Sequence, residues 1–234
     1  MGIKERQVRD RETVRRAILD AARELFVAEG FQNVSIRKIA ERIEYSPAAI
    51  YGYFPSKDDI FFALAEEGFR LLGDRGAGRL AQTDHPPSLD RVRGVFRRLY
   101  EFSRDYPQYF ALMFVDRSVP RISREYERFA FAREMKGNIM KEIASCVDAG
   151  LLPRSIDPAV AMRMLTMGVV GVAVLRLSDR LAPGENADQL AEDMLNLTCA
   201  GLQSGIALQS SSASNCPLEE QAVQEQQVVD ARAS

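Results

Sequence analysis

The sequence is poor in the residues that enzyme centres and structural metal sites most often use. It has one histidine, His85, set in a loop beside two prolines, and three widely spaced cysteines, Cys146, Cys199 and Cys216. No nucleophile–base arrangement, metal-ligand cluster or glycine-rich phosphate loop accompanies them. We therefore predict a chain that is not an enzyme, carries no cofactor or metal, and keeps its cysteines reduced.

Long apolar runs are also lacking. The opening segment, 1–29, is dense in charge and has no apolar core of a signal peptide. The longest weakly polar stretch, Met164–Leu175, is shorter than the ~18 residues that a membrane span needs. We expect a soluble cytoplasmic protein with no membrane contact.

The chain lacks a charge excess of the kind that marks a strongly basic nucleic-acid binder, since 31 Lys and Arg face 33 Asp and Glu. The distribution is more informative. Residues 1–57 hold 11 basic and 8 acidic side chains, whereas 210–234 holds one basic and four acidic. The C-terminal segment is also rich in Ser, Gln and Glu, so we predict that it is disordered.

Strand patterns are nearly absent, and the N-terminal quarter reads as four helices. Serines stand as N-caps before the second and third helices, Pro47 takes the first position of the third, and Ser56 with Asp59 forms a capping-box-like start of the fourth. The first three are expected at about Arg11–Glu29, Ser35–Glu44 and Pro47–Phe54.

Helical spacing continues beyond a loop at Thr83–Ser88. The branched run Val169–Val174 suits a strand, but it lies inside a longer helical pattern without a partner strand. The class is therefore all-α, with domains at 1–57 and 58–209 and the disordered tail at 210–234. Later helices are expected at Leu89–Asp105, Pro107–Val115, Ile122–Val147, Pro158–Leu177 and Asp188–Leu208.

Two short helices joined by a tight turn are the geometry of a helix-turn-helix, whose second helix enters the major groove of DNA. The residues around that turn closely resemble the tetracycline-repressor (TetR) family over about Ile18–Ile60. The matching stretches are Ala21-Ala22-x-x-Leu25-Phe26 with Gly30-Phe31, Ser35-Ile36-Arg37-Lys38-Ile39-Ala40, Ser46-Pro47-Ala48-Ala49-Ile50-Tyr51-Gly52-Tyr53-Phe54, and Ser56-Lys57-Asp58.

Several of these residues can contact DNA phosphates. Ser35 opens a helix whose free amides attract an anion, and the hydroxyls of Tyr51 and Tyr53 can donate to phosphate oxygens. Lys57 resembles the family's phosphate-contacting lysine. The alternatives are an ordinary cap for Ser35, tyrosines packed on their neighbours, and a solvated charge for Lys57.

Base recognition has few candidates, because the third helix is short of polar side chains. Its DNA-facing positions are predicted to be Ser46, Pro47, Ala48, Ala49 and Gly52, of which the proline, alanines and glycine offer only apolar contact with thymine methyls.

The resemblance implies that Arg37 can reach a base edge, where Arg can bond guanine O6 and N7; pairing with phosphate or with Glu41 is the alternative. Glu44 and Tyr45 depart from the family pattern, which has glycine and a small apolar residue at the turn.

The resemblance implies that the rest of the chain forms a helical domain that binds a small molecule and dimerises through its last two long helices. Ordinary internal packing of those helices is the alternative. Flexible or aromatic side chains could line an apolar ligand cavity, although core packing would place them equally well. The candidates are Tyr100, Phe110, Met113, Phe114, Met135 and Met167.

Together these features predict a homodimeric DNA-binding transcriptional regulator, expected to be a repressor released from its operator by a small-molecule effector. The alternative is a DNA-binding protein without such a ligand, acting in chromosome organisation or through a protein partner. A well-formed internal cavity would favour the first possibility, and a fully packed core would favour the second.

Overall fold

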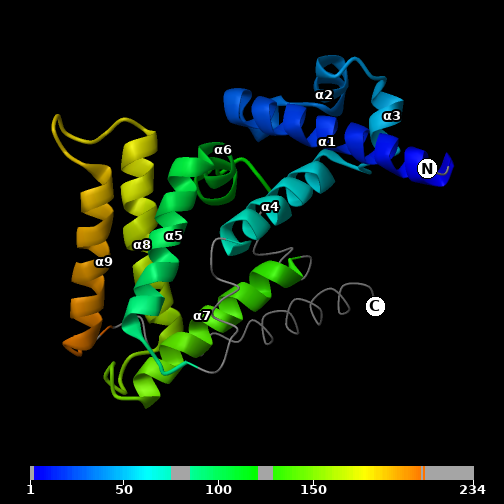
Figure 1. Ribbon diagram of the computed structural model, residues 1–234. Helices are drawn as coiled ribbons and strands as arrows, with labels where there is room; N and C mark the ends of the chain where they lie inside the picture. Colours follow the sequence, from blue (N-terminus) through cyan, green and yellow to red (C-terminus); the bar gives the residue numbers. More distant parts are fainter. Residues whose placement is uncertain (1–2, 75–84, 121–128, 207, 209–234) are drawn as a thin grey trace, which may run out of the picture.

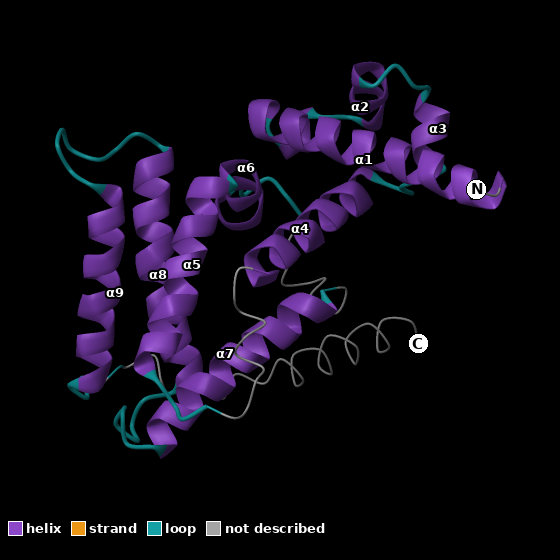
Figure 2. Cartoon of the chain, in the orientation of Figure 1, coloured by secondary structure: helices purple, strands orange, loops and turns teal. Residues whose placement is uncertain are grey.

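A computed structural model describes residues 3–74, 85–120, 129–206 and 208 (Figure 1). These residues form helices joined by turns, and no strand occurs among them (Figure 2). The predicted all-α class is confirmed, and Val169–Val174 lies inside the helix α8 (Pro158–Leu177). The segment predicted to be disordered, 210–234, lies outside the described residues.

The N-terminal helices agree with the sequence in kind and differ in length. The first helix begins eight residues before the predicted Arg11, because its early turns are polar and show no apolar spacing. The third ends at Tyr51 with Gly52 as its C-cap, three residues before the predicted Phe54. These elements are α1 (Ile3–Glu29), the 3-10 turn η1 (Phe31–Asn33), α2 (Ile36–Arg42) and α3 (Pro47–Tyr51).

The next helix, α4 (Lys57–Asp74), starts with the predicted capping box. The Asp59 amide donates to Ser56 Oγ at 3.1 Å, and that hydroxyl donates to the Asp59 carboxylate at 2.6 Å. Gly73 does not end the helix. A Cβ at this position would lie 2.3 Å from Phe131 Cζ, so the glycine allows close approach of the next layer.

The C-terminal helices follow the prediction with three corrections. The helix predicted at Ile122–Val147 begins at Ala130 after the N-cap Phe129, and residues 122–128 lie outside the described residues. The stretch 107–115, predicted as one α-helix, is a short α-helix followed by a π-helical turn. The last helix ends at Gln203 and not at Leu208, because Gly205 adopts a left-handed φ of 75°. The elements are α5 (Leu89–Asp105), α6 (Pro107–Phe110), η3 (Ala111–Val115), α7 (Ala130–Asp148), α8 and α9 (Ala187–Gln203).

These helices form two regions that α4 connects. In Figure 1, α5, α8 and α9 run side by side, with α7 crossing near their lower ends, while α1, α2 and α3 gather at the opposite side. Helix α4 packs against α1 at one end and against α7 at the other. It is therefore shared between the helix-turn-helix and the bundle.

Aromatic rings continue the core across that junction. A single buried apolar cluster extends from Ile18 in α1 to Leu202 in α9. Within it, Phe31 contacts the ring of Phe61 on α4 with centroids 5.8 Å apart, and Phe62 contacts Phe129 at the same distance. Phe129 in turn contacts Phe69, near the other end of α4. The helix-turn-helix is thus joined to the bundle by side-chain packing as well as by the chain.

Helix α8 is long and apolar enough, by length and composition, to cross a membrane. It packs against α5, α7 and α9, as the central helix of a bundle does. Since core helices of soluble proteins pass the same test, this is weak support for a membrane span.

Candidate nucleic-acid interface and effector cavity

The turn between α2 and α3 is closed by a Schellman motif, and a glutamate occupies its left-handed position. The Tyr45 amide donates to Ala40 O at 2.9 Å and the Glu44 amide to Glu41 O at 3.3 Å. Glu44 has a φ of 59°, where glycine is favoured. The turn therefore keeps the geometry that a glycine would give, at some cost in backbone strain.

Both helices of the motif begin with a serine cap, as predicted. Ser35 Oγ accepts from the Lys38 amide, and Ser46 Oγ accepts from the Ala49 amide, each at 3.2 Å. Each serine therefore satisfies one of the free amides at a helix start.

Helix α3 is anchored by one buried side chain and presents small residues to solvent. Ile50 is fully buried, whereas Tyr51 keeps 55% of its surface exposed. Ala49 and Tyr53 are half-buried. The exposed positions Ser46, Pro47, Ala48 and Gly52 leave a shallow face that the backbone of another molecule can approach closely.

Arg37 lies on the exposed face of α2, with 81% of its side chain accessible. Its Nε donates to Glu41 Oε1 at 2.8 Å, one helical turn further on. That hydrogen bond raises the pKa of the guanidinium above its ordinary value. The pair stands at the surface, so it can exchange for another acceptor at small cost.

Lys57, at the start of α4, is held by the helix-turn-helix itself. Its Nζ donates to Phe31 O at 2.7 Å and to Val34 O at 2.9 Å, and it lies 4.1 Å from the Phe31 ring centroid. Burial lowers the pKa of this ammonium from its ordinary value. Two of its three N–H donors are thus used inside the protein, which leaves one for an external oxygen.

Two arginines of α1 that the sequence analysis did not single out lie beside the end of α3. Arg11 Nη2 donates to Gly52 O at 3.3 Å, and its guanidinium lies 5.3 Å from the Tyr53 ring centroid. Arg15 lies over the Phe54 ring at the same distance. The signal available in the sequence was the basic excess before residue 17, which lies outside the stretch that resembles the TetR family.

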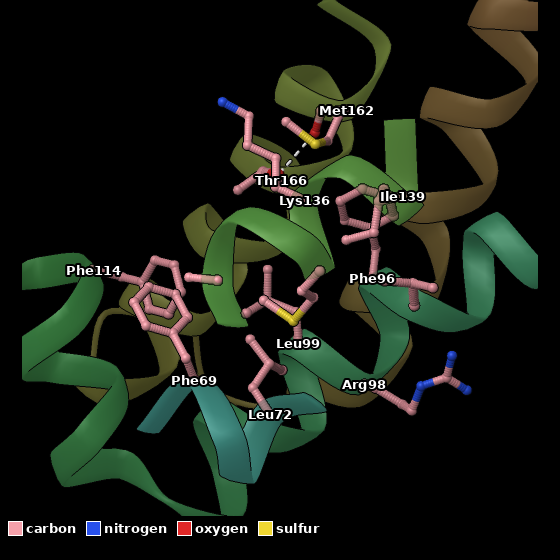
Figure 3. A pocket seen from close by; sticks show the side chains of 13 residues that line it. Phe69, Leu72, Phe96, Arg98, Leu99, Phe114, Lys136, Ile139, Met162 and Thr166 are labelled. Atoms are coloured by element: carbon pink, nitrogen blue, oxygen red, sulfur yellow. Dashed lines mark hydrogen bonds between the residues drawn. The ribbon is translucent and has the colours of Figure 1, made fainter. Parts of the chain in front are cut away.

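A cavity of about 170 Å³ lies in the bundle between α4, α5, α7 and α8 (Figure 3). Its wall is almost entirely apolar. The Thr166 hydroxyl donates to Met162 O at 2.7 Å, and in Figure 3 the charged ends of Arg98 and Lys136 point away from the other lining side chains. The lining residues are Phe69, Leu72, Val95, Phe96, Arg98, Leu99, Phe114, Ala132, Met135, Lys136, Ile139, Met162 and Thr166.

Phe114 and Met135 are the two predicted ligand residues that line this cavity. Tyr100 and Phe110 are buried in the core instead, and Met113 approaches α4 beside Gly68. Burial and the hydrogen bond from the Tyr100 hydroxyl to Asp188 raise the pKa of Tyr100 to about 12.

Helix α4 supplies part of the cavity wall that was not predicted from the sequence. Phe69 and Leu72 are three residues apart and therefore share one face of the helix. The sequence shows this spacing. It does not show whether that face of the helix borders a cavity or a packed core.

Met167 lies away from the cavity, on a second apolar surface along α8 and α9. It is 52% exposed and lines an open groove with Met164 and Met194. Leu197 on α9 and Ile206 after it are 69% and 59% exposed. A face this apolar on two long helices is typical of a surface covered by another protein chain.

A polar contact joins the helix-turn-helix to the segment that carries Phe114. Arg23 of α1 donates to Gln108 Oε1 at 3.0 Å and to the Tyr109 hydroxyl at 2.9 Å. Its guanidinium also lies 5.1 Å from the Tyr109 ring centroid. Both partners belong to α6, which continues directly into η3 and the cavity wall.

Comparisons with known proteins match both regions. Residues 18–64 match the profile of "Bacterial regulatory proteins, tetR family", and residues 92–198 match "Tetracyclin repressor-like, C-terminal domain". The chain is similar to the transcriptional regulator TcmR of Streptomyces glaucescens, with 27% identity over 155 residues, 62% of this chain and 63% of that protein.

It is also similar to the nucleoid occlusion factor SlmA of Sodalis glossinidius, with 34% identity over 138 residues, 55% of this chain and 66% of that protein. These matches span less than two thirds of either relative. A solved TetR/AcrR-family regulator from Thermobifida fusca covers 81% of this chain and 98% of its own, with a TM-score of 0.55 and 26% identity.

The matches account for the helix-turn-helix and the helical bundle together, in the order in which they occur along the chain. They confirm the resemblance on which the sequence analysis relied. The chain belongs to the TetR family of bacterial regulatory proteins.

Proposed function

We propose that this chain is a cytoplasmic, homodimeric transcriptional repressor that binds a DNA operator and leaves it when a small molecule binds the bundle. The observation that carries the proposal is the shallow exposed face of α3, held at a fixed angle by capped helices in a family of regulators. We assign DNA binding to residues 1–57 and ligand binding and dimerisation to residues 58–209.

The DNA contacts divide by chemistry. Ser35, Tyr51, Tyr53 and Lys57 would contact phosphates and fix the position of α3 on the duplex. The small residues of α3 and its C-cap would lie close to the bases and favour thymine methyls, with Ser46 at their start. They are Pro47, Ala48, Ala49 and Gly52.

Specificity beyond this would come from Arg37, which would exchange Glu41 for a guanine edge. Supporting this, Arg37 is the more exposed of the two long polar side chains in the N-terminal turn of α2, with 81% of its side chain accessible against 44% for Lys38.

The cavity favours a compact, neutral, largely apolar effector. Apolar cavities of about 150 Å³ accept a molecule the size of benzene, and this one is of similar volume. In Figure 3 the charged ends of Arg98 and Lys136 point away from the other lining side chains, which favours an occupant without charge. Helix α4 supplies Phe69 to the cavity wall and Lys57 to the helix-turn-helix. A molecule in the cavity that displaces Phe69 can therefore move the helix-turn-helix through α4.

Dimerisation would cover the exposed face of α8 and α9. The groove between them and the exposed Leu197 support this assignment. Two copies related by a twofold axis would present two α3 helices to an inverted repeat. Sedimentation should therefore give a dimer at micromolar concentration, and a monomer both with and without DNA would contradict the proposal.

The DNA-binding part is tested by selecting bound duplexes from a random pool with the full chain. We expect an inverted repeat that binds at least ~10³-fold more tightly than random duplex. Equal binding to all duplexes would reject a specific operator.

The effector part is tested by thermal unfolding with a panel of cyclic alcohols and simple aromatics. Ala132→Leu, which narrows the cavity from its wall, is the matched control. A compound that fits should raise the melting temperature of the wild type and leave that of Ala132→Leu unchanged. No shift by any compound would remove the support for this effector class.

The second candidate is a DNA-binding protein that needs no small molecule and acts in chromosome organisation or through a protein partner. The similarity to a nucleoid occlusion factor favours it, and the cavity in the bundle speaks against it. Binding sites mapped across the genome separate the two. A repressor should occupy few promoter-proximal sites, whereas a chromosome-organising protein should occupy many sites spread along the chromosome.

A further inference from the structure

The cations of the helix-turn-helix fall into two groups. Most are neutralised by a neighbouring carboxylate: Lys38 pairs with Glu29, and Arg42 with Glu24 at 3.0 Å. Arg37 likewise pairs with Glu41. In each such pair a nearby carboxylate already offsets the charge of the cation, so its attraction for a phosphate is weakened.

Arg11 belongs to the other group. It bonds a carbonyl and stacks on a ring, and no ion pair joins it to a carboxylate among the residues that the structure describes. The side chain is exposed, and one guanidinium N–H bond to Gly52 O leaves further donors directed toward solvent. Its charge is therefore available to a phosphate without the loss of an ion pair.

The position of Arg11 also fits an extended DNA surface. Its guanidinium lies over Tyr53 and beside the C-cap of α3, where the helix dipole leaves exposed carbonyls. Figure 1 shows the N-terminal end of α1 running past α3. A duplex seated on α3 would thus meet α1 on the flank of that helix.

We propose that Arg11 of α1 is a DNA phosphate contact outside the helix-turn-helix, and that it also holds the end of α3 in place through Gly52. The proposal rests on the DNA-binding function above. It extends the contact surface to the first helix, in which the sequence analysis named no DNA contact.

The two roles of Arg11 can be separated by chemistry. Arg11→Gln removes the charge and keeps an N–H donor on a shorter side chain, whereas Arg11→Lys keeps the charge and loses the planar fork. Arg154→Gln is the matched control, because it removes one exposed arginine from the loop between α7 and α8, on the bundle.

The experiment measures DNA affinity of the full chain against salt concentration, on the selected operator and on random duplex. Each phosphate contact contributes about 0.9 to the slope of log affinity against log salt concentration. A variant that lacks one contact should therefore lose roughly fourfold less affinity than the wild type between 50 and 200 mM salt. Arg11→Gln should flatten the slope by about one per subunit on both duplexes, while Arg11→Lys and Arg154→Gln keep the wild-type slope.

Two outcomes would overturn the proposal. A wild-type slope for Arg11→Gln, with or without weaker binding, would leave Arg11 as a cap of α3 only. An equal flattening of the salt slope by Arg154→Gln would show that the slope follows the net charge of the protein and not a contact made by Arg11. Failure of the proposed function looks different, because the wild type itself would then show no salt-dependent binding to either duplex. Circular dichroism melting of each variant checks that the overall fold and its stability are retained.

Discussion

The helix-turn-helix and the bundle become ordered in different ways. Helices α2 and α3 have seven and five residues, too short to be stable alone. Local devices hold them: two serine caps, a proline at the first turn and a Schellman turn at Glu44. The long helices of the bundle depend instead on side chains that meet from distant parts of the sequence.

This difference suits the two proposed tasks. A DNA-reading helix must keep one orientation, and the serine caps and the turn add local hydrogen bonds to the anchoring of α3 by the buried Ile50. A sensor must exist in two packings, and a cavity walled by Phe69, Phe114 and Met135 leaves room for that. We therefore expect α3 to keep one conformation and the cavity wall to repack, with α4 connecting the two.

The largest expected effect comes from breaking the packing that joins the two regions. Phe61 is fully buried and contacts Phe31 and Phe62. Phe61→Ala should lower the free energy of unfolding by about 3–5 kcal/mol, because it leaves a cavity in the shared core.

Denaturant unfolding followed by circular dichroism measures this loss, and Phe61→Leu, which keeps most of the volume, is the control. If Phe61→Ala costs less than Phe61→Leu, the two regions are not joined through this ring.

The next effect concerns base recognition. Arg37→Ala should cost about 1–3 kcal/mol of binding on the selected operator and relax preference at one base pair per half-site. Binding to single-base variants and to random duplex measures it. Equal losses on all duplexes would assign Arg37 to phosphate. Glu41→Gln, which frees Arg37 without removing it, should leave the preference intact.

A smaller effect is expected at Lys57, where the two regions meet. Lys57→Ala removes two hydrogen bonds from a charged donor, so the free energy of unfolding should fall by about 1–2 kcal/mol. The salt slope of DNA binding should also flatten by about one unit per subunit if its third donor meets a phosphate. An unchanged slope together with lost stability would show that Lys57 only joins α4 to η1 and the residue after it, and does not contact DNA.

The sequence was most informative where structure is local. The caps at Ser35 and Ser46 and the box at Ser56 are short-range signals, and each was confirmed. The early turns of α1 escaped detection because a polar helix has no apolar period. The π-helical turn η3 escaped because a π-turn and an α-turn have the same composition.

The cavity could be predicted in chemical character but not in membership. Any of the aromatic or methionine residues of the bundle could have lined it, and burial in the core looks the same in sequence. Which side chains line the cavity depends on how the surrounding helices pack against each other. Thus Phe114 and Met135 line the wall, while Tyr100 became a core residue bonded to Asp188.

The smallest expected effect sharpens the view that the turn is fixed locally. Glu44→Gly relieves a left-handed residue, which costs about 1–2 kcal/mol in backbone strain, but it also loosens the unfolded chain. The net gain in unfolding free energy should be about 0.5–1 kcal/mol. Glu44→Ala keeps the strain and should show no gain. A gain for both variants would point to the charge of Glu44 and not to its φ.

The central claim is that occupancy of the cavity and binding of the operator oppose each other. The most direct measurement is the affinity for the selected operator with and without a saturating amount of the compound that best stabilises the wild type. We expect the compound to weaken operator binding by about tenfold or more, as a coupling of ~1.4 kcal/mol requires. Ala132→Leu should bind the operator equally well in both conditions. Unchanged operator affinity of the wild type, with the compound shown to occupy the cavity, would contradict the account.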